Sequence, residues 1–121
     1  MNTQEVGQKL VDLCKLGKNT EAIQTLYAQD IVSVEAASMP GMPAEMRGIE
    51  AILGKTKWWQ ENNQVHHADI QGPFPHGDRF AVYFHYDITQ KSDNKRITMK
   101  EVGLYTVKSD KVVREEFYYS T

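Results

Sequence analysis

Long stretches rich in β-branched and aromatic residues fill the second half of the chain and are separated by short polar turns. They cover residues 65–71, 79–90, 95–108 and 111–120. Turns this short join neighbouring strands only when the strands run antiparallel, so this half predicts an antiparallel meander. The sequence Gly-Pro-Phe-Pro-His-Gly-Asp at residues 72–78 predicts a turn between the first two strands.

The first half of the chain instead shows the spacing of amphipathic helices. The pattern predicts one helix capped by Asn2 or Thr3 and ended by Gly17, and a second, short helix that Asn19 can cap and that has Tyr27 on its apolar side. A third helix follows Gly48, and its apolar side is formed by Ile49, Ile52, Leu53, Thr56 and Trp59, with Trp58 on the opposite side. Residues 30–37 predict a strand inside this helical half. Helices that precede a sheet indicate an α+β protein, with three helices packed on a strongly curved, mostly antiparallel sheet.

Length and charge narrow the class of protein. The 121 residues are expected to form one domain, residues 1–121. A net charge of −2 provides no electrostatic attraction for nucleic acid or for anionic membranes. The polar N-terminus and the lack of an apolar run of about 20 residues lead us to expect a cytoplasmic protein. The single cysteine, Cys14, lies on an apolar helical stripe, and we expect a buried, unreactive side chain.

Four segments carry a resemblance to a known family: Leu-Tyr-Ala-Gln-Asp-Ile-Val-Ser-Val-Glu at 26–35, Arg-Gly-Ile-Glu-Ala-Ile at 47–52, Glu-Val-Gly-Leu-Tyr-Thr at 101–106 and Lys-Val-Val-Arg-Glu-Glu-Phe-Tyr at 111–118. With this order of elements, the chain resembles the nuclear transport factor two-like superfamily. More narrowly, it is similar to SnoaL-like domains and, distantly, to ketosteroid isomerase. The resemblance implies a cone-shaped α+β barrel around an internal pocket. Proteins of this superfamily include isomerases, cyclases, dehydratases and proteins with no catalytic role.

The resemblance also implies roles for two carboxyl groups. Glu35 stands where ketosteroid isomerases have their general base, and Glu101 matches the carboxyl that donates a hydrogen bond to the oxyanion. The tyrosine that those isomerases carry on the first helix is replaced here by Leu10 or Val11, and His66 or Tyr86 could take its place. We therefore expect Glu35, Glu101 and His66 to be the catalytic residues. Proton abstraction next to a carbonyl requires this combination of a base and an oxyanion donor.

Alternation of side chains along the strands predicts which residues line the pocket. Glu101 shares its face with Met99, Gly103 and Tyr105, and His66 is expected to share a face with Ala68 and Ile70. The predicted lining residues are Trp59, Phe84, Tyr86, Glu115, Phe117, Tyr119 and Met39. The methionine-rich loop 38–47, which includes Met39, either closes the core or covers the pocket mouth.

Each polar candidate also has a purely structural interpretation. Glu35 could form an ion pair at a strand end, Glu101 could belong to a buried polar pair, and Glu115 could be an exposed charge within Arg114-Glu115-Glu116. We expect no metal site, because His66 and His67 are adjacent on a strand and point in opposite directions. No glycine-rich phosphate loop is present, and we expect no cofactor.

Three functions remain open from the sequence. The first is a cofactor-free acid/base isomerase, dehydratase or cyclase that acts on a small apolar carbonyl or hydroxyl compound. The second is a non-catalytic module that binds a small apolar ligand. The third is a structural or interaction protein with a vestigial pocket. For each of them we expect a homodimer formed through the outer face of the sheet, because the long strands carry apolar residues on both faces.

Overall fold

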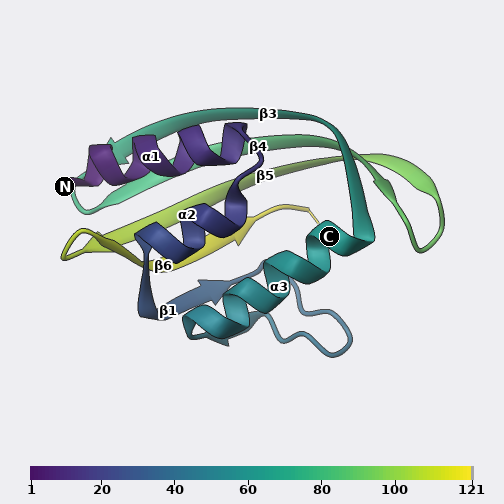
Figure 1. The fold of residues 1–121 in the computed structure, drawn as a ribbon, viewed down its shortest axis with the longest axis horizontal. Coiled ribbons are helices and arrows are strands. Elements are labelled where there is room, and N and C mark those ends of the chain that lie inside the picture. Colours follow the sequence, from purple (N-terminus) through teal and green to yellow (C-terminus); the bar gives the residue numbers. More distant parts are fainter. Residues whose placement is uncertain (121) are drawn as a thin grey trace.

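A computed structural model describes residues 1–120, with three helices packed on one six-stranded mixed sheet (Figure 1). The helices are α1 (Thr3–Lys15), α2 (Asn19–Leu26) and α3 (Ile49–Asn62). The strands are β1 (Tyr27–Val34), β2 (Glu45–Arg47), β3 (Asn63–His76), β4 (Arg79–Gln90), β5 (Lys95–Lys108) and β6 (Lys111–Tyr118). The α+β fold predicted from the sequence is confirmed, although the sheet is open and does not close into a barrel.

The strand order in the sheet is β2-β1-β6-β5-β4-β3. Strands β3 to β6 form the expected antiparallel meander, whereas β1 from the helical half pairs in parallel with β6. In Figure 1 the helices lie in front of the sheet, and α1 runs along the long strand β3. The parallel β1–β6 pair brings β1, which leads into the segment that carries Glu35, next to the last strand of the meander.

Local capping explains where the first helix begins. The Asn2 side chain accepts a hydrogen bond from the Glu5 backbone N–H at 2.9 Å, and the Glu5 carboxylate accepts one from the Asn2 N–H at 3.1 Å. This reciprocal pair satisfies two N–H groups that a helix start leaves without partners. The apolar stripe of α1, which includes Val6, Leu10 and Val11, is then buried in the core.

The segment 72–76 differs from its prediction. We expected residues 72–78 to form a turn, but β3 continues to His76 and only Gly77 and Asp78 turn the chain. A register shift between Gln71 and Phe74 accommodates Pro73, whereas Pro75 lies opposite Phe80 in the regular register. Proline is tolerated here because β3 is an edge strand, so the missing N–H groups break no ladder.

Two element boundaries also differ from the predictions. Tyr27 begins β1 instead of ending the second helix, and β1 ends at Val34, three residues before the predicted end. The predicted loop 38–47 contains the short strand β2, which pairs with β1. The boundaries of β1 and the presence of β2 depend on pairing between strands, which local propensity does not encode.

Gly7 marks the closest approach of α1 to the sheet. A Cβ atom at this position would lie 2.8 Å from Pro73 Cβ and 3.1 Å from the Phe80 ring. We expect Gly7→Ala to lower the free energy of unfolding by about 1–3 kcal/mol through overpacking, despite the better helix propensity of alanine. Gly54 in α3 is the matched control, because a Cβ there meets nothing within 4 Å. Gly54→Ala should stabilise the protein by up to about 1 kcal/mol.

Urea denaturation of both glycine variants checks this prediction. If Gly7→Ala were as stable as the unmodified protein, the close packing of α1 against Pro73 and Phe80 would be contradicted.

Candidate active site

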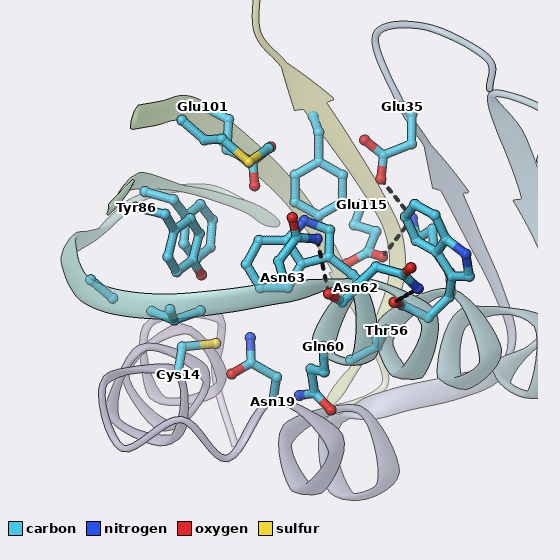
Figure 2. Close-up of a pocket in the computed structure, with 18 of the residues that line it drawn as sticks. Cys14, Asn19, Glu35, Thr56, Gln60, Asn62, Asn63, Tyr86, Glu101 and Glu115 are labelled. Carbon is cyan, nitrogen blue, oxygen red and sulfur yellow. Dashed lines mark hydrogen bonds and ion pairs between the residues drawn. The ribbon is translucent and has the colours of Figure 1, made fainter. Parts of the chain in front are cut away.

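A cavity of about 1320 Å³ lies between the helices and the inner face of the sheet (Figure 2). All seven residues predicted to line a pocket are placed along this cavity: Trp59, Phe84, Tyr86, Glu115, Phe117, Tyr119 and Met39. Met39 and Met42 of the loop and Met46 of β2 lie on its wall. Ligand pockets of several hundred Å³ typically hold a small organic molecule, so this cavity is large enough for one.

Glu115 is the most deeply buried carboxyl group at the cavity, with 3% of its surface exposed. Ser33 Oγ donates a hydrogen bond to Glu115 Oε1 at 2.8 Å, and the Tyr27 hydroxyl donates to Oε2. The pKa of Glu115 is raised, because the effect of burial exceeds the opposite effects of the nearby Lys55 ammonium and of these two hydrogen bonds. The interpretation of Glu115 as an exposed charge is therefore wrong. β6 places it on the inner face of the sheet together with Phe117, two residues further along the strand.

Glu35 follows β1 and lies at the centre of a second polar group. Lys55 Nζ on α3 donates to Glu35 Oε1 at 2.8 Å, and the Tyr119 hydroxyl donates to Glu35 Oε2 at 3.1 Å. Lys55 Nζ also donates to Ser33 Oγ at 2.7 Å and lies 4.0 Å from Glu115 Oε1. Both carboxyl oxygens of Glu35 thus accept a hydrogen bond.

Glu101 points into the cavity from β5, opposite Phe84 of β4 (Figure 2). Within residues 1–120 its carboxyl group has no hydrogen-bond partner. Burial raises the pKa of Glu101 to about 7, and the negative charge of Glu35 adds to this increase while Lys55 opposes it. Near neutral pH, Glu101 is therefore able to hold or to release a proton.

Aromatic rings form the apolar wall between these groups. The ring centroids of Trp59 and Tyr86 are 5.5 Å apart, and those of Phe84 and Tyr86 are 6.0 Å apart. Burial raises the pKa of Tyr86, so its phenol stays protonated. The Phe117 ring lies under Lys55, with 5.4 Å between Nζ and the ring centroid. An apolar wall lowers the local dielectric constant, which strengthens electrostatic interactions beside it.

His66 touches the cavity rim but does not join the carboxyl groups. A register shift between Val65 and His67 makes His66 the extra residue of a bulge, so the expected alternation breaks at this position. Its side chain is exposed, and Nε2 lies 2.6 Å from Oγ1 of Thr89. Thr89 follows the buried Ile88 on β4, so its side chain is on the outer face of the sheet. The structure therefore brings Glu35, Glu101 and Glu115 to one cavity and turns the His66 imidazole toward the other face of the sheet.

Lys55 is a site residue that the sequence analysis missed. It lies three residues after Ile52 and four before Trp59, and this spacing puts it on the inward face of α3. A lysine at such a position among apolar neighbours is a signal that a carboxylate lies nearby, because a buried ammonium needs a partner. Ser33 and Tyr27 were likewise not predicted to bond Glu115.

Other site classes receive no support from the described part of the chain. No group of three or more His, Cys, Asp or Glu side chains within residues 1–120 is arranged to hold a metal ion. Burial raises the pKa of the Cys14 thiol to about 12, so the thiolate is not formed near neutral pH. None of the helices in residues 1–120 has the length and apolar character that a membrane span requires.

Three helices on a curved mixed sheet form the cone-shaped α+β fold of nuclear transport factor two-like proteins. Within this class, the chain belongs to the SnoaL-like domain family, whose model matches residues 1–119.

Solved structures agree with this assignment. A candidate SnoaL-like polyketide cyclase from Mesorhizobium loti is 44% identical, with a TM-score of 0.91 over 98% of this chain and 100% of that one. A hypothetical protein with a ketosteroid isomerase-like fold from Catenulispora acidiphila, solved with trimethylamine, is 23% identical, with a TM-score of 0.75 over 98% and 88% of the two chains. A candidate isomerase from Bacillus subtilis is 13% identical, with a TM-score of 0.78 over 99% and 90%. No curated protein gives a significant match.

Proposed function

We propose that this protein is a cofactor-free acid/base enzyme, a cyclase, isomerase or dehydratase that acts on a small apolar compound with a carbonyl or hydroxyl group. One observation supports this proposal most strongly. Glu35 accepts hydrogen bonds from Lys55 and Tyr119, whereas Glu101 in the same cavity has no partner within residues 1–120 and a pKa near 7. Two carboxyl groups in different protonation states are what paired acid and base chemistry requires.

The proposed chemistry assigns one role to each carboxyl group. Glu35 removes a proton from the carbon next to the substrate carbonyl, and the electrons of the broken C–H bond move onto the carbonyl oxygen. Protonated Glu101 donates a hydrogen bond to that oxygen as its negative charge develops. The proton on Glu35 then returns to a different carbon in an isomerisation, or to a leaving hydroxyl group in a dehydration. We assign no role to His66, because its imidazole bonds to Thr89.

Replacing Glu35 tests the proposal. Glu35→Gln should lower turnover at least 100-fold, because general base catalysis typically contributes that much. The amide oxygen of glutamine can still accept a hydrogen bond from Lys55, and the amide NH2 can donate to the Tyr119 hydroxyl. Hydrogen–deuterium exchange at the carbon next to the carbonyl, followed by NMR over a panel of cyclic and aromatic ketones, detects proton abstraction before the natural substrate is known. Glu45→Gln is the control, because Glu45 is an exposed carboxylate on the neighbouring strand β2.

Circular dichroism must show that both variants are folded. Normal exchange by folded Glu35→Gln would remove Glu35 from the mechanism.

The second candidate function is a binding module for a small apolar ligand, and the volume of the cavity and its aromatic wall support it. A molecule that is carried through purification, identified by mass spectrometry and released unchanged would favour this function. The same cavity argues against an interaction protein with a vestigial pocket, because a vestigial pocket would be filled by side chains.

Dimerisation through the outer face of the sheet stays a prediction. Val102 and Tyr118 are cross-strand neighbours on this face, and they are 40% and 52% exposed. Light scattering in solution measures the mass that distinguishes one chain from two.

A further inference from the structure

We propose that Lys55, held in place by the buried Glu115, decides which of the two cavity carboxyl groups is charged, so that Glu35 stays ionised and Glu101 keeps a proton. Lys55 and Glu115 are then positioning residues that act through Glu35 and Glu101. The inference rests on the proposed function for the roles of those two groups, but the charge states themselves are measurable without any substrate.

The contacts of the two carboxyl groups are unequal. Lys55 Nζ donates to Glu35 at 2.8 Å, and Tyr119 bonds the other oxygen of the same carboxylate. No such donor within residues 1–120 bonds Glu101. An ammonium in direct contact favours the charged form of its carboxylate far more than that of a distant one. The ionised Glu35 in turn disfavours a second negative charge on Glu101.

Glu115 explains why the ammonium stays beside Glu35. The hydrogen bonds run in one direction, from Lys55 Nζ to Ser33 Oγ and from Ser33 Oγ to Glu115 Oε1, and Tyr27 donates to the other oxygen of Glu115. Both oxygens of Glu115 accept hydrogen bonds, and these two bonds partly offset the cost of a negative charge at this buried position. The Lys55 side chain is only 15% exposed and lies 4.0 Å from Glu115 Oε1, so it is restrained by two carboxylates.

The charges in this cavity come from several elements of the fold. Glu35 is faced by Lys55 from α3, by Glu101 from β5, by Glu115 from β6 and by Tyr119 after β6. Glu101 is faced by Glu35, Lys55, Glu115 and the phenols of Tyr86, Tyr105 and Tyr119. Lys55 is the one cation among these groups. Its removal should therefore change the charge balance of the whole cavity.

The first experiment is an NMR titration of glutamate side-chain carboxyl groups in ¹³C-labelled protein. At about pH 6, below the pKa of Glu101, unmodified protein should show an ionised Glu35 and a mainly protonated Glu101. In Lys55→Met the proton should be shared, so that the Glu35 carbon moves by at least a third of the full change that protonation causes. Lys55→Arg should restore the ionised state.

Lys57→Met is the matched control, because Lys57 lies on the same helix and, among residues 1–120, forms an ion pair only with the exposed Glu61. A Glu35 that stays fully ionised in folded Lys55→Met, as in Lys57→Met, would overturn the inference. Thermal melting monitors whether each variant is folded.

Glu115→Gln keeps the inference testable if Lys55→Met does not fold. This variant preserves the shape of the side chain and removes one negative charge, so the pKa of Glu101 should fall by about half a unit or more. Glu115→Gln should therefore lower the protonation of Glu101, whereas Lys55→Met should raise the protonation of Glu35. An unchanged pKa of Glu101 would overturn the role of Glu115. A lack of catalytic exchange in the unmodified protein would refute the proposed function and leave these charge measurements intact.

Discussion

Glu115→Ala should lower the free energy of unfolding by about 3–5 kcal/mol, the range expected when one partner of a buried, hydrogen-bonded charge is removed. The substitution leaves the buried Tyr27 hydroxyl without its acceptor and takes from Ser33 the oxygen to which it donates. It also removes one of the two carboxylates that surround the Lys55 ammonium. Each unsatisfied buried group adds its own desolvation cost.

Glu116→Ala is the matched control for this prediction. Glu116 is adjacent in sequence, but alternation places it on the outer face, where it bonds Arg114 and Tyr118. We expect its removal to cost less than about 1 kcal/mol, as for other surface ion pairs. Urea denaturation of the two variants measures the difference. Equal losses of stability would mean that the buried network around Glu115 contributes nothing beyond a surface contact.

The second large effect is a pH dependence that arises from Glu101. Its pKa is raised from the usual 4.5 to about 7 in the folded protein. Below pH 4.5 the group is neutral in both the folded and the unfolded chain. Between about pH 4.5 and 7 the unfolded chain ionises first, so the stability of the folded protein falls as the pH rises through this window. One pKa unit corresponds to about 1.4 kcal/mol, and the total loss is therefore about 3 kcal/mol.

Glu101→Gln isolates this contribution, because glutamine does not titrate. The difference in unfolding free energy between the variant and the unmodified protein should change by about 3 kcal/mol from pH 4 to pH 8, with the unmodified protein losing stability. A turnover that needs protonated Glu101 should decline over the same range as the pH rises through about 7. A constant difference between the two proteins across this range would contradict the raised pKa.

Some features of the fold and the site were predictable because they depend on local periodicity. Alternation along β5 placed Met99, Glu101 and Tyr105 on one face, and the structure has all three at the cavity. This prediction succeeded because β5 pairs with β4 without a register shift from Lys95 to Thr106.

The sequence by itself determined the order of the three helices and of the strands β1 and β3 to β6, and the side chains of β5 that share a face. Only the tertiary structure decided that a bulge turns the His66 imidazole away from the carboxyl groups, that the segment 72–76 belongs to an edge strand, and that Lys55 meets Glu35 and Glu115. The physical reason is the range of the interactions. Alternation and capping act over a few residues, whereas a bulge depends on the partner strand, and a buried ion pair joins residues 20 or more positions apart.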